Sequence, residues 1–371
     1  MFKNTIIYIV IFLAFVILPK PCCATPQIRA ASAAIGDVKS GLLIYEKNAR
    51  EKRPPASLTK VMTAIIAVEY GNINQNVKVS AKAARIPPSK LYIHSGEIIQ
   101  LNSLLKSALM ISANDACVAI AEHVGGEEEY FVNLMNLKAW ALGMENTHFV
   151  NTNGLPANDH YSCAVDLVRL GIYSRQVPYV NEYTAQKSDT IIRSGRKETL
   201  NNTNKLLWSY PGANGIKTGT TNLAGQCLVS SAIIGEKAFV SVVLKAGDRY
   251  TDSRALLDYA FQNYNPMKVF SKDRVETLSV GRKNIDIQVT ALQDYYYPYA
   301  DDETVKAYII PLKGINKIPL KGEKCGLLAI VTVDKVLWYD IFAKENSPQE
   351  TIYDRLQYFV EDILLSFTKN I

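Results

Sequence analysis

A helical period of apolar residues begins just after Ser57. Apolar side chains recur at the three- and four-residue spacing of one helix face from Leu58 to Ile66. The turn-forming pair Pro54-Pro55 stands just before this run, so the pattern predicts a helix that starts at Ser57 and ends near Gly71. Weaker periods of the same kind predict further helices from Ser103 to Ser112, from Ser112 to Ala121, from Glu127 to Leu142, from Asp166 to Ser174 and from Ser253 to Asn263.

Runs of alternating apolar and polar residues predict strands around these helices. Residues 30–48 hold two such runs joined by the turn Lys39-Ser40-Gly41, which is the pattern of a β-hairpin. Between residues 215 and 244, apolar stretches predict further strands. Residues 77–95 show neither period, and Pro87-Pro88 indicates a loop there.

The texture of the chain changes in its last third. From Val269 to Ala343, apolar and polar residues alternate in short runs. These runs are separated by turns such as Lys313-Gly314 and Lys321-Gly322. A chain of 371 residues exceeds one typical domain. We therefore expect a first domain over residues 25–265 and a small all-β domain over residues 266–346.

The two ends of the chain differ from both domains. Lys3 precedes an apolar run from Ile6 to Leu18, which is too short to span a bilayer comfortably, and small residues follow up to Ala24. The pattern favours a cleaved secretory signal over residues 1–24 rather than a retained anchor, which places the mature protein outside the cytoplasm. Residues 347–371 form an amphipathic helical stripe with an acidic opposite face. This helix either lies on a membrane surface or packs against the β-domain.

Composition excludes several classes of function. The chain is 48% hydrophobic and 20% charged, as expected of a globular protein, and its net charge of +6 is too mild to suggest binding to nucleic acid. The cysteines beyond the signal show neither C-x-x-C nor zinc spacing, so we predict no metal site and no cofactor. Buried free thiols are favoured, although a disulfide such as Cys163–Cys227 stays open. These four cysteines are Cys117, Cys163, Cys227 and Cys325.

Ser57 and Lys60 lie one turn apart on the predicted helix and can perform nucleophilic catalysis together. A partly desolvated lysine amine loses its proton and can then take the hydroxyl proton of the serine. The start of a helix also favours the negative charge that develops there. Because Ser-x-x-Lys occurs four times in the chain, this pair needs support from other motifs.

Two further motifs follow in order, Ser112-Ala113-Asn114 and Lys217-Thr218-Gly219. Ser112 can relay a proton toward a leaving nitrogen, and Asn114 can hydrogen-bond a substrate amide. Lys217 adds positive charge, which lowers the pKa of neighbouring amines and attracts a carboxylate. Either motif alone is typical of a plain helix cap or a turn, and it is their occurrence together that predicts one site.

The strand motif also offers groups that can bind a substrate. The hydroxyls of Thr218 and Thr220 can bind a carboxylate, and Gly219 lets a substrate backbone approach as an added edge strand. Arg249 is a further candidate partner for the carboxylate, with a plain surface arginine as the alternative. We expect the oxyanion hole at the backbone N–H groups of Ser57 and Thr220.

These motifs resemble those of the D-alanyl-D-alanine carboxypeptidases, low-molecular-mass penicillin-binding proteins of the serine peptidase S11 type. The resemblance implies a mixed α/β (α+β) domain of the β-lactamase and transpeptidase type, with an antiparallel sheet flanked by helices and a helical cluster beside it. A small all-β domain and an amphipathic tail helix would follow. The stretches that carry the resemblance are Pro55–Thr63, Ser112–Ala116, Asn146–Asn151, Gly154-Leu155 and Gly215–Thr221.

The resemblance also implies an activity. Such enzymes remove the terminal D-alanine from peptidoglycan pentapeptide stems through a penicillin-sensitive acyl-enzyme, here on Ser57 with Lys60 as general base. β-Lactam antibiotics would therefore be inhibitors. Asn153 stands where some relatives have a histidine, which bears on the rate of deacylation. Vegetative wall and spore cortex both stay open as the substrate.

Two other functions are compatible with parts of the pattern. A class A β-lactamase shares the three motifs, but it needs a glutamate-bearing loop, and the matching loop here, Asn151–Pro156, has no glutamate. A wall-binding or penicillin-sensing module without activity could keep the same fold. The intact motifs argue against this third hypothesis.

Overall fold

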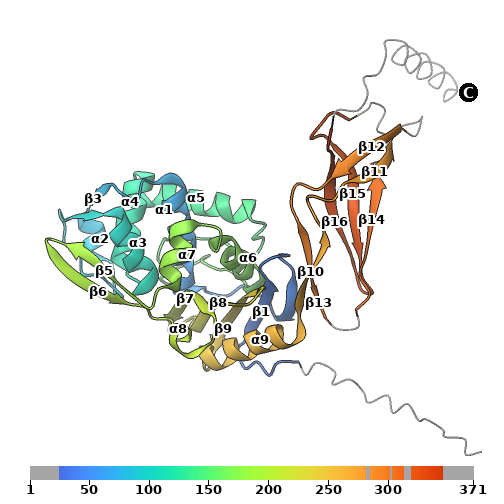
Figure 1. Ribbon diagram of the computed structural model, residues 1–371. Coiled ribbons are helices and arrows are strands. Elements are labelled where there is room, and N and C mark those ends of the chain that lie inside the picture. Colours follow the sequence, from blue (N-terminus) through green and yellow to red (C-terminus); the bar gives the residue numbers. More distant parts are fainter. Residues whose placement is uncertain (1–24, 281–284, 301–302, 313–318, 346–371) are drawn as a thin grey trace, which may run out of the picture.

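The structure is a computed structural model that describes residues 25–280, 285–300, 303–312 and 319–345. The predicted signal over residues 1–24 and the predicted tail helix over residues 347–371 lie outside the described residues. Helices and a sheet form the first part of the described chain, and strands form the second part (Figure 1). Within the described ranges, none of the helices combines the length and apolar character needed to cross a membrane.

A five-stranded antiparallel sheet forms the centre of the first part, in the strand order β2-β1-β9-β8-β7. The hairpin predicted within residues 30–48 is present, and Ala33 of β1 pairs with Lys47 of β2. The bounds of the strands are Ser32–Asp37 for β1, Leu43–Lys47 for β2, Ala213–Thr221 for β7, Gly225–Ile234 for β8 and Lys237–Ala246 for β9.

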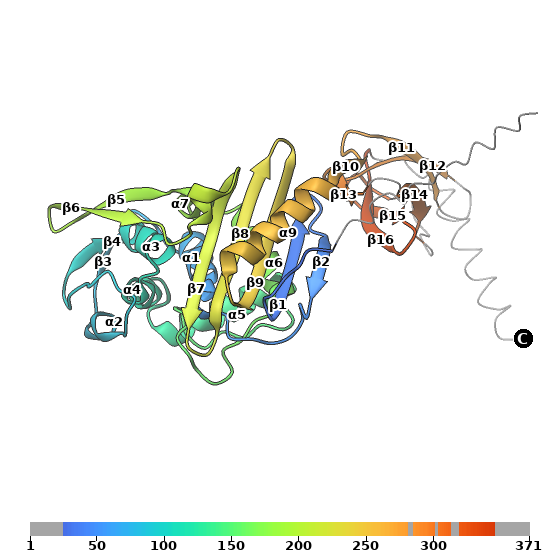
Figure 2. The same cartoon turned by 90° about the horizontal axis from the view of Figure 1, so that it is seen from below.

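The central strands are apolar at successive positions because helices cover both faces of the sheet. Leu228 and Phe239 pack on the side that α9 (Arg249–Asn263) covers, whereas Val229 and Val240 belong to the core on the opposite side. Figure 2 shows α9 lying across one face, with α6 (Ala164–Ser174) behind the sheet.

A cluster of helices surrounds α1, the helix that follows Ser57. The buried residues of α1 extend from Thr59 to Ala67, so this helix is enclosed on all sides rather than along one stripe. A 3₁₀ turn, η1 (Ala56–Leu58), leads into it, so the α-helix starts two residues later than predicted. The helices of this part are α1 (Thr59–Tyr70), α2 (Ala81–Arg85), α3 (Leu101–Met110), α4 (Asn114–Gly125), α5 (Glu128–Ala141), α7 (Pro178–Ala185) and α8 (Leu206–Ser209).

Several elements were missed or misplaced by the sequence patterns. The stretch predicted to be irregular contains β3 (Asn76–Lys78) and α2, where the Ser80 hydroxyl accepts a hydrogen bond from the Ala83 N–H as an N-cap. Helix α9 begins at Arg249 rather than Ser253, because Asp248 caps it and accepts from the Tyr250 N–H. The patterns gave no prediction for α7 or α8, nor for β4 (Ile98–Gln100) and the hairpin of β5 (Ser188–Arg193) and β6 (Arg196–Asn201).

The second part of the chain is built from two antiparallel sheets. The larger has the strand order β11-β12-β16-β15-β14, and the smaller pairs β10 with β13. Their shared core includes Phe270, Leu328 and Ile341. The bounds are Asn265–Phe270 for β10, Glu276–Val280 for β11, Ile285–Thr290 for β12, Tyr295–Tyr299 for β13, Lys306–Pro311 for β14, Lys324–Val331 for β15 and Val336–Ala343 for β16.

The four cysteines beyond the predicted signal are all buried free thiols. The alternative disulfide between Cys163 and Cys227 is therefore not formed. Burial raises the pKa of the Cys163 and Cys325 thiols to about 11. These thiols are un-ionised at neutral pH.

Candidate active site

Ser57 and Lys60 lie together where η1 meets α1. The Nζ atom of Lys60 is 2.7 Å from the Oγ atom of Ser57 and 2.5 Å from the carbonyl oxygen of Asn153. Lys60 is fully buried, whereas Ser57 is partly exposed and lines a cleft. The Ser57 hydroxyl is thus accessible to solvent, and the Lys60 amine that contacts it is not. This is the arrangement of a nucleophile and its base.

Burial controls the protonation of Lys60. Desolvation lowers the pKa of Lys60 to about 8, against the opposing effects of Cys117 and Asp115. The same burial raises the pKa of the Cys117 thiol to about 12, so this neighbour carries no charge at neutral pH. A substantial fraction of Lys60 is consequently neutral near pH 8 and able to accept a proton.

The second wall of the cleft comes from the turn between α3 and α4. Ser112 adopts a positive φ of 64° there, and its side chain faces the cleft. Asn114 is the first residue of α4, and its amide donates to the carbonyl oxygen of Pro87 at 2.9 Å. The prediction that this motif caps the helix is wrong: the N-cap is Ala113, which makes no side-chain bond. The Asp115 carboxylate accepts instead from the backbone N–H groups of Leu91 and Ile93.

Strand β7 forms the third wall. Lys217 is fully buried, and its pKa lies well below the ordinary value because of burial and then the charge of Lys60. Its Nζ donates to the Thr218 carbonyl oxygen at 3.1 Å. Gly219 lies against η1, since a Cβ atom at this position would be 3.2 Å from the backbone nitrogen of Ser57. A side chain at this position would crowd η1, so glycine favours the close approach of the strand to the nucleophile.

Arg249, at the start of α9, joins β7 to β8. Its guanidinium donates to the carbonyl oxygens of Gly219 at 2.9 Å and Cys227 at 3.0 Å, and also to the Thr220 hydroxyl. Burial lowers the pKa of Arg249 from its ordinary value. Arg249 is buried rather than on the surface, and it lines the cleft beside Thr220.

The cleft has a volume of about 440 Å³. Five of the predicted site residues line it, namely Ser57, Ser112, Thr218, Thr220 and Arg249. The other four lie behind its walls, where Lys60, Lys217, Gly219 and Asn114 are buried. Three segments that are distant in the sequence thus converge on one cleft.

Several lining residues were missed by the sequence patterns. The Tyr250 hydroxyl donates to the Thr203 carbonyl oxygen at 3.0 Å, and the Thr203 and Thr218 hydroxyls are 2.7 Å apart. These contacts join the β6–α8 connection to α9 and to β7. None of these residues belongs to a recognisable motif, so the sequence carried no signal for them. The remaining missed residues are Ser89, Ile111, Lys205 and Gln226.

His160 supports the start of α1 from behind. Its Nε2 atom is 2.9 Å from the Thr59 hydroxyl, and its Nδ1 atom accepts from the Val150 N–H at 3.0 Å. Burial lowers the pKa of His160 to about 4, so the ring is neutral at ordinary pH. A neutral ring with its proton on Nε2 satisfies both contacts, because Thr59 in turn donates to the Ala56 carbonyl oxygen.

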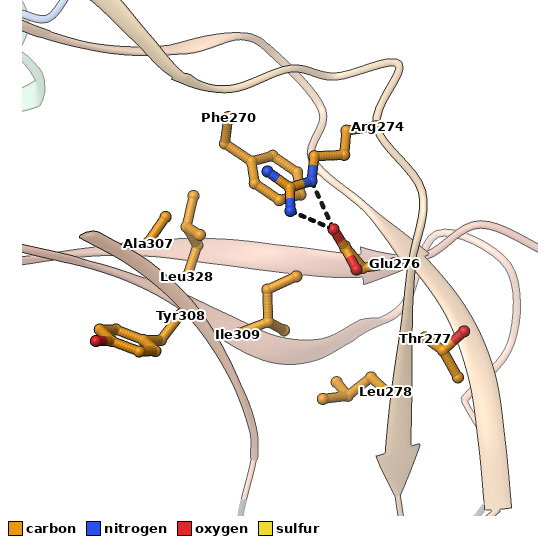
Figure 3. Close-up of a pocket in the computed structure, with 9 residues that line it drawn as sticks. All are labelled: Phe270, Arg274, Glu276, Thr277, Leu278, Ala307, Tyr308, Ile309 and Leu328. Atoms are coloured by element: carbon orange, nitrogen blue, oxygen red, sulfur yellow. Dashed lines mark hydrogen bonds and ion pairs between the residues drawn. The ribbon is translucent and has the colours of Figure 1, made fainter. Parts of the chain in front are cut away.

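A second hollow, of about 240 Å³, lies in the β-domain between β11 and β14. Figure 3 shows that Arg274 and Glu276 pair with each other at its rim, and that most of the remaining lining is apolar. This hollow has no serine, cysteine or lysine among its lining residues, so it offers no nucleophile and base for acyl transfer.

Among the residues that the structure describes, no three His, Cys, Asp or Glu side chains are grouped so that they could hold a metal ion. Apart from Tyr250, the ionisable side chains at the cleft are instead basic, namely Lys60, Lys205, Lys217 and Arg249. Such a site favours the binding of an anionic group, and a carboxylate fits its hydroxyl and guanidinium donors.

A family model described as D-alanyl-D-alanine carboxypeptidase, peptidase S11, matches residues 20–248. DacF of Bacillus subtilis, named a D-alanyl-D-alanine carboxypeptidase, is 32% identical over 323 residues, which cover 83% of this chain and 83% of that protein. DacA of Escherichia coli K12, with the same description, is 36% identical over 263 residues, covering 66% of this chain and 64% of that protein.

Solved structures agree with the sequence matches. Penicillin binding protein 5 of Haemophilus influenzae is 27% identical, covers 87% of this chain and 99% of that chain, and superposes with a TM-score of 0.77. A mutant of the Streptomyces K15 DD-transpeptidase is 28% identical, covers 64% of this chain and 99% of that chain, and superposes with a TM-score of 0.61. The fold is thus that of the penicillin-binding and transpeptidase enzymes, as expected from the sequence.

Proposed function

Because the chain belongs to the D-alanyl-D-alanine carboxypeptidase family of serine peptidases, we propose that it removes the terminal D-alanine from peptidoglycan stem peptides through an acyl-enzyme on Ser57. The observation that carries this proposal is the contact of 2.7 Å between Ser57 Oγ and the buried amine of Lys60, whose pKa is about 8. A hydroxyl at the cleft surface can give its proton to this amine as it attacks a carbonyl carbon.

The reaction has two stages. Ser57 Oγ bonds to the carbonyl carbon of the D-Ala-D-Ala peptide bond, and Lys60 takes the hydroxyl proton. Ser112, which lines the cleft near Ser57, passes a proton to the leaving nitrogen, so that D-alanine departs and an ester remains on Ser57. Water then attacks the ester carbon and gives a proton to the Lys60 amine. The Ser57 oxygen leaves and takes a proton back, which restores the hydroxyl.

Binding groups surround the reacting carbon. The Thr218 and Thr220 hydroxyls and Arg249 receive the terminal carboxylate, and the buried amine of Lys217 lies behind them on β7. Asn114 binds a substrate amide, for which its side chain would leave Pro87, and Gly219 admits the substrate backbone beside β7. The backbone N–H groups of Ser57 and Thr220 form the oxyanion hole.

The proposal includes a cellular setting and an inhibitor class. The secretory signal predicted over residues 1–24 supports action outside the cytoplasm, where peptidoglycan stems are exposed. β-Lactams carry a reactive carbonyl beside a carboxylate, so they should acylate Ser57 and inhibit the enzyme.

Release of free D-alanine tests this function directly. The mature protein should release D-alanine from a peptide that ends in D-Ala-D-Ala, and Ser57→Ala should abolish release. Mass spectrometry after penicillin treatment should find the added mass on Ser57 and on no other residue. Release that survives in Ser57→Ala would overturn the assignment of the nucleophile.

A further inference from the structure

The loop of residues 151–155 contacts Lys60 through its backbone. The Asn153 carbonyl oxygen accepts from Lys60 Nζ at 2.5 Å, while the Asn153 side chain turns back to accept from the Leu155 N–H at 3.0 Å. Gly154 follows with a φ of +82°, and a Cβ atom there would be 1.8 Å from the Ala56 carbonyl oxygen. The loop therefore packs tightly behind the nucleophile, and its carbonyl is the third group beside the Ser57–Lys60 pair.

Thr152 holds this carbonyl from the neighbouring position. Thr152 is fully buried, and its carbonyl oxygen accepts from the Thr63 hydroxyl at 2.6 Å. Its hydroxyl donates to Glu128 Oε1 at 2.9 Å, and its N–H points to the same oxygen at 3.4 Å. Thr63 belongs to α1, the helix of Lys60, so Thr152 is fixed between that helix and the Glu128 carboxylate.

Glu128 has no part in the reaction as described above. It is the first residue of α5, and its side chain is only 14% exposed. The carboxylate joins two segments, because Oε1 accepts from Thr152 and Oε2 pairs with Lys82 of α2 at 2.7 Å. A mostly buried carboxylate with a partner on each oxygen is held in one orientation, which is the property that a rigid support needs.

We propose that Glu128 is a positioning residue for the general base, acting through Thr152 and the Asn153 carbonyl on Lys60. An amine that donates one N–H to a fixed carbonyl can rotate less, and its lone pair is then directed toward the Ser57 hydroxyl. This is the role that a third group plays for the base in other activated nucleophiles. The inference rests on the proposed function, since it assumes that Lys60 takes the proton of Ser57.

The carbonyl should also influence the charge of Lys60. An acceptor that bonds the ammonium favours the charged form, so loss of this contact would lower the pKa of Lys60. The ionisable groups that act on the pKa of Lys60 are Cys117 and Asp115 from α4. Lys60 in turn lowers the pKa of Lys217 from β7 and of His160 from the loop that follows Asn153. The Glu128 carboxylate also raises the pKa of Cys117. Thr152→Val keeps that carboxylate, so this variant separates the loss of the hydrogen bond from the loss of the charge.

Four variants test the proposal, with the acylation rate by a penicillin as the measurement. Glu128→Ala removes the carboxylate that contacts both Thr152 and Lys82. Glu128→Gln keeps an oxygen that can accept from the Thr152 hydroxyl, and Thr152→Val removes only the donor. The matched control is Glu69→Ala, which removes a similarly buried ion pair, Glu69 with Lys138 at 2.6 Å, away from the loop.

We expect Glu128→Ala and Thr152→Val to lower the acylation rate on the order of tenfold while penicillin binding before acylation is unchanged. In both variants, the rise of the acylation rate with pH should occur at lower pH than in the wild type, because the pKa of Lys60 is lower. Glu128→Gln and Glu69→Ala should behave as the wild type. If Glu128 has a purely structural role, Glu128→Ala should lower the melting temperature but leave the acylation rate of the folded protein and its dependence on pH unchanged. That result would overturn the proposal.

Two further outcomes decide the matter. If Glu128→Gln is as slow as Glu128→Ala, the hydrogen bond to Thr152 is not the cause and the proposal fails. If the wild type is not acylated at all, the proposed function fails. The positioning role is then tested by measuring the pKa of Lys60 by ¹⁵N NMR instead of the acylation rate. A pKa of Lys60 that is lower in Thr152→Val, which keeps the Glu128 charge, than in the wild type supports positioning, and an equal value refutes it.

Discussion

Two lysine side chains, Lys60 and Lys217, are fully buried near the nucleophile. Burial disfavours the charge of each, and the charge of Lys60 further disfavours that of Lys217. A buried lysine normally needs a carboxylate partner, but here the polar partners of the two amines are the Ser57 hydroxyl and the carbonyl oxygens of Asn153 and Thr218. The site thus keeps an amine that can lose its proton near neutral pH.

The pH dependence of acylation should report this amine. Because burial lowers the pKa of Lys60 to about 8, the neutral base forms as pH rises through this value. We expect the rate of acylation by a penicillin to rise about tenfold per pH unit below about pH 7 and to level off above about pH 9. Stopped-flow measurements between pH 5 and pH 10 check this. A flat profile over that range would contradict the role of Lys60 as base.

Arg249 serves both the strand and the cleft, and a substitution can separate the two tasks. Arg249→Lys keeps a charge but loses the fork that a carboxylate prefers. We expect kcat/KM for a peptide ending in free D-alanine to fall about 10- to 100-fold, or about 1.4–2.7 kcal/mol, because the two parallel hydrogen bonds of the guanidinium are lost. The control substrate is the same peptide with a C-terminal amide. An equal loss for both substrates would show that Arg249 only holds β7 in place.

At the scale of elements, the nucleophile is fixed by two backbone segments that touch η1. Gly219 of β7 approaches Ser57 from one side, and Gly154 approaches Ala56 from the other. A Cβ atom would overlap the Ala56 carbonyl at Gly154 and would be crowded by η1 at Gly219, so η1 is clamped between a strand and a loop. Because packed backbone cannot shift without moving its neighbours, this clamp fixes the position of Ser57.

Gly154→Ala should damage both stability and activity. The alanine would need a positive φ, which costs about 1–2 kcal/mol, and its Cβ would clash with the Ala56 carbonyl group. The control is Gly195→Ala in the β5–β6 turn, where φ is +74° and no atom lies within 4 Å of the added Cβ. Thermal melts should show a clearly larger loss for Gly154→Ala, and acylation should fall in that variant alone. Equal losses in the two variants would refute the clamp.

The elements that were predicted best from the sequence are those in which apolar residues recur regularly and a motif stands at one end. Ser57 and Lys60 could be paired from the helical spacing after Ser57, and Lys217 could be placed on a strand. The cap expected at Ser112 does not form because α4 begins at Asn114, so Ala113 is the N-cap and Ser112 faces the cleft, while Asp115 bonds Leu91 and Ile93. A tertiary contact of this kind overrides the local preference of a polar residue for a cap.

The sequence could not predict the support of the base. The group that contacts Lys60 from the loop is a backbone carbonyl, and every residue has one, so Asn153 carries no signal for this role. Likewise Thr203 and Tyr250 reach the cleft only because the β6–α8 connection folds against α9. Side chains that bear chemistry leave a trace in the sequence, whereas backbone contacts and cleft walls depend on the fold.

At the scale of the whole molecule, the described residues form separate cores. The two cores around the central sheet contain residues up to Ala260, and the core of the β-domain begins at Phe270. Contacts between the two parts include the Lys39 amine over the Tyr296 ring at 5.0 Å and a hollow of about 300 Å³ lined from both sides. An interface of this kind carries no shared core, so each part has the material to fold alone.

Every residue that lines the cleft lies between Ser57 and Tyr250. We therefore expect a protein that spans residues 25–263 to fold and to be acylated by penicillin at a rate within about twofold of the full chain. Fluorescent penicillin and circular dichroism would measure the two properties on the same sample. If the shortened protein folds but is acylated many times more slowly, the β-domain orders the cleft from a distance, and the two parts act as one unit. A rate unchanged by the truncation assigns the β-domain a task outside the chemistry, such as placing the cleft relative to the wall.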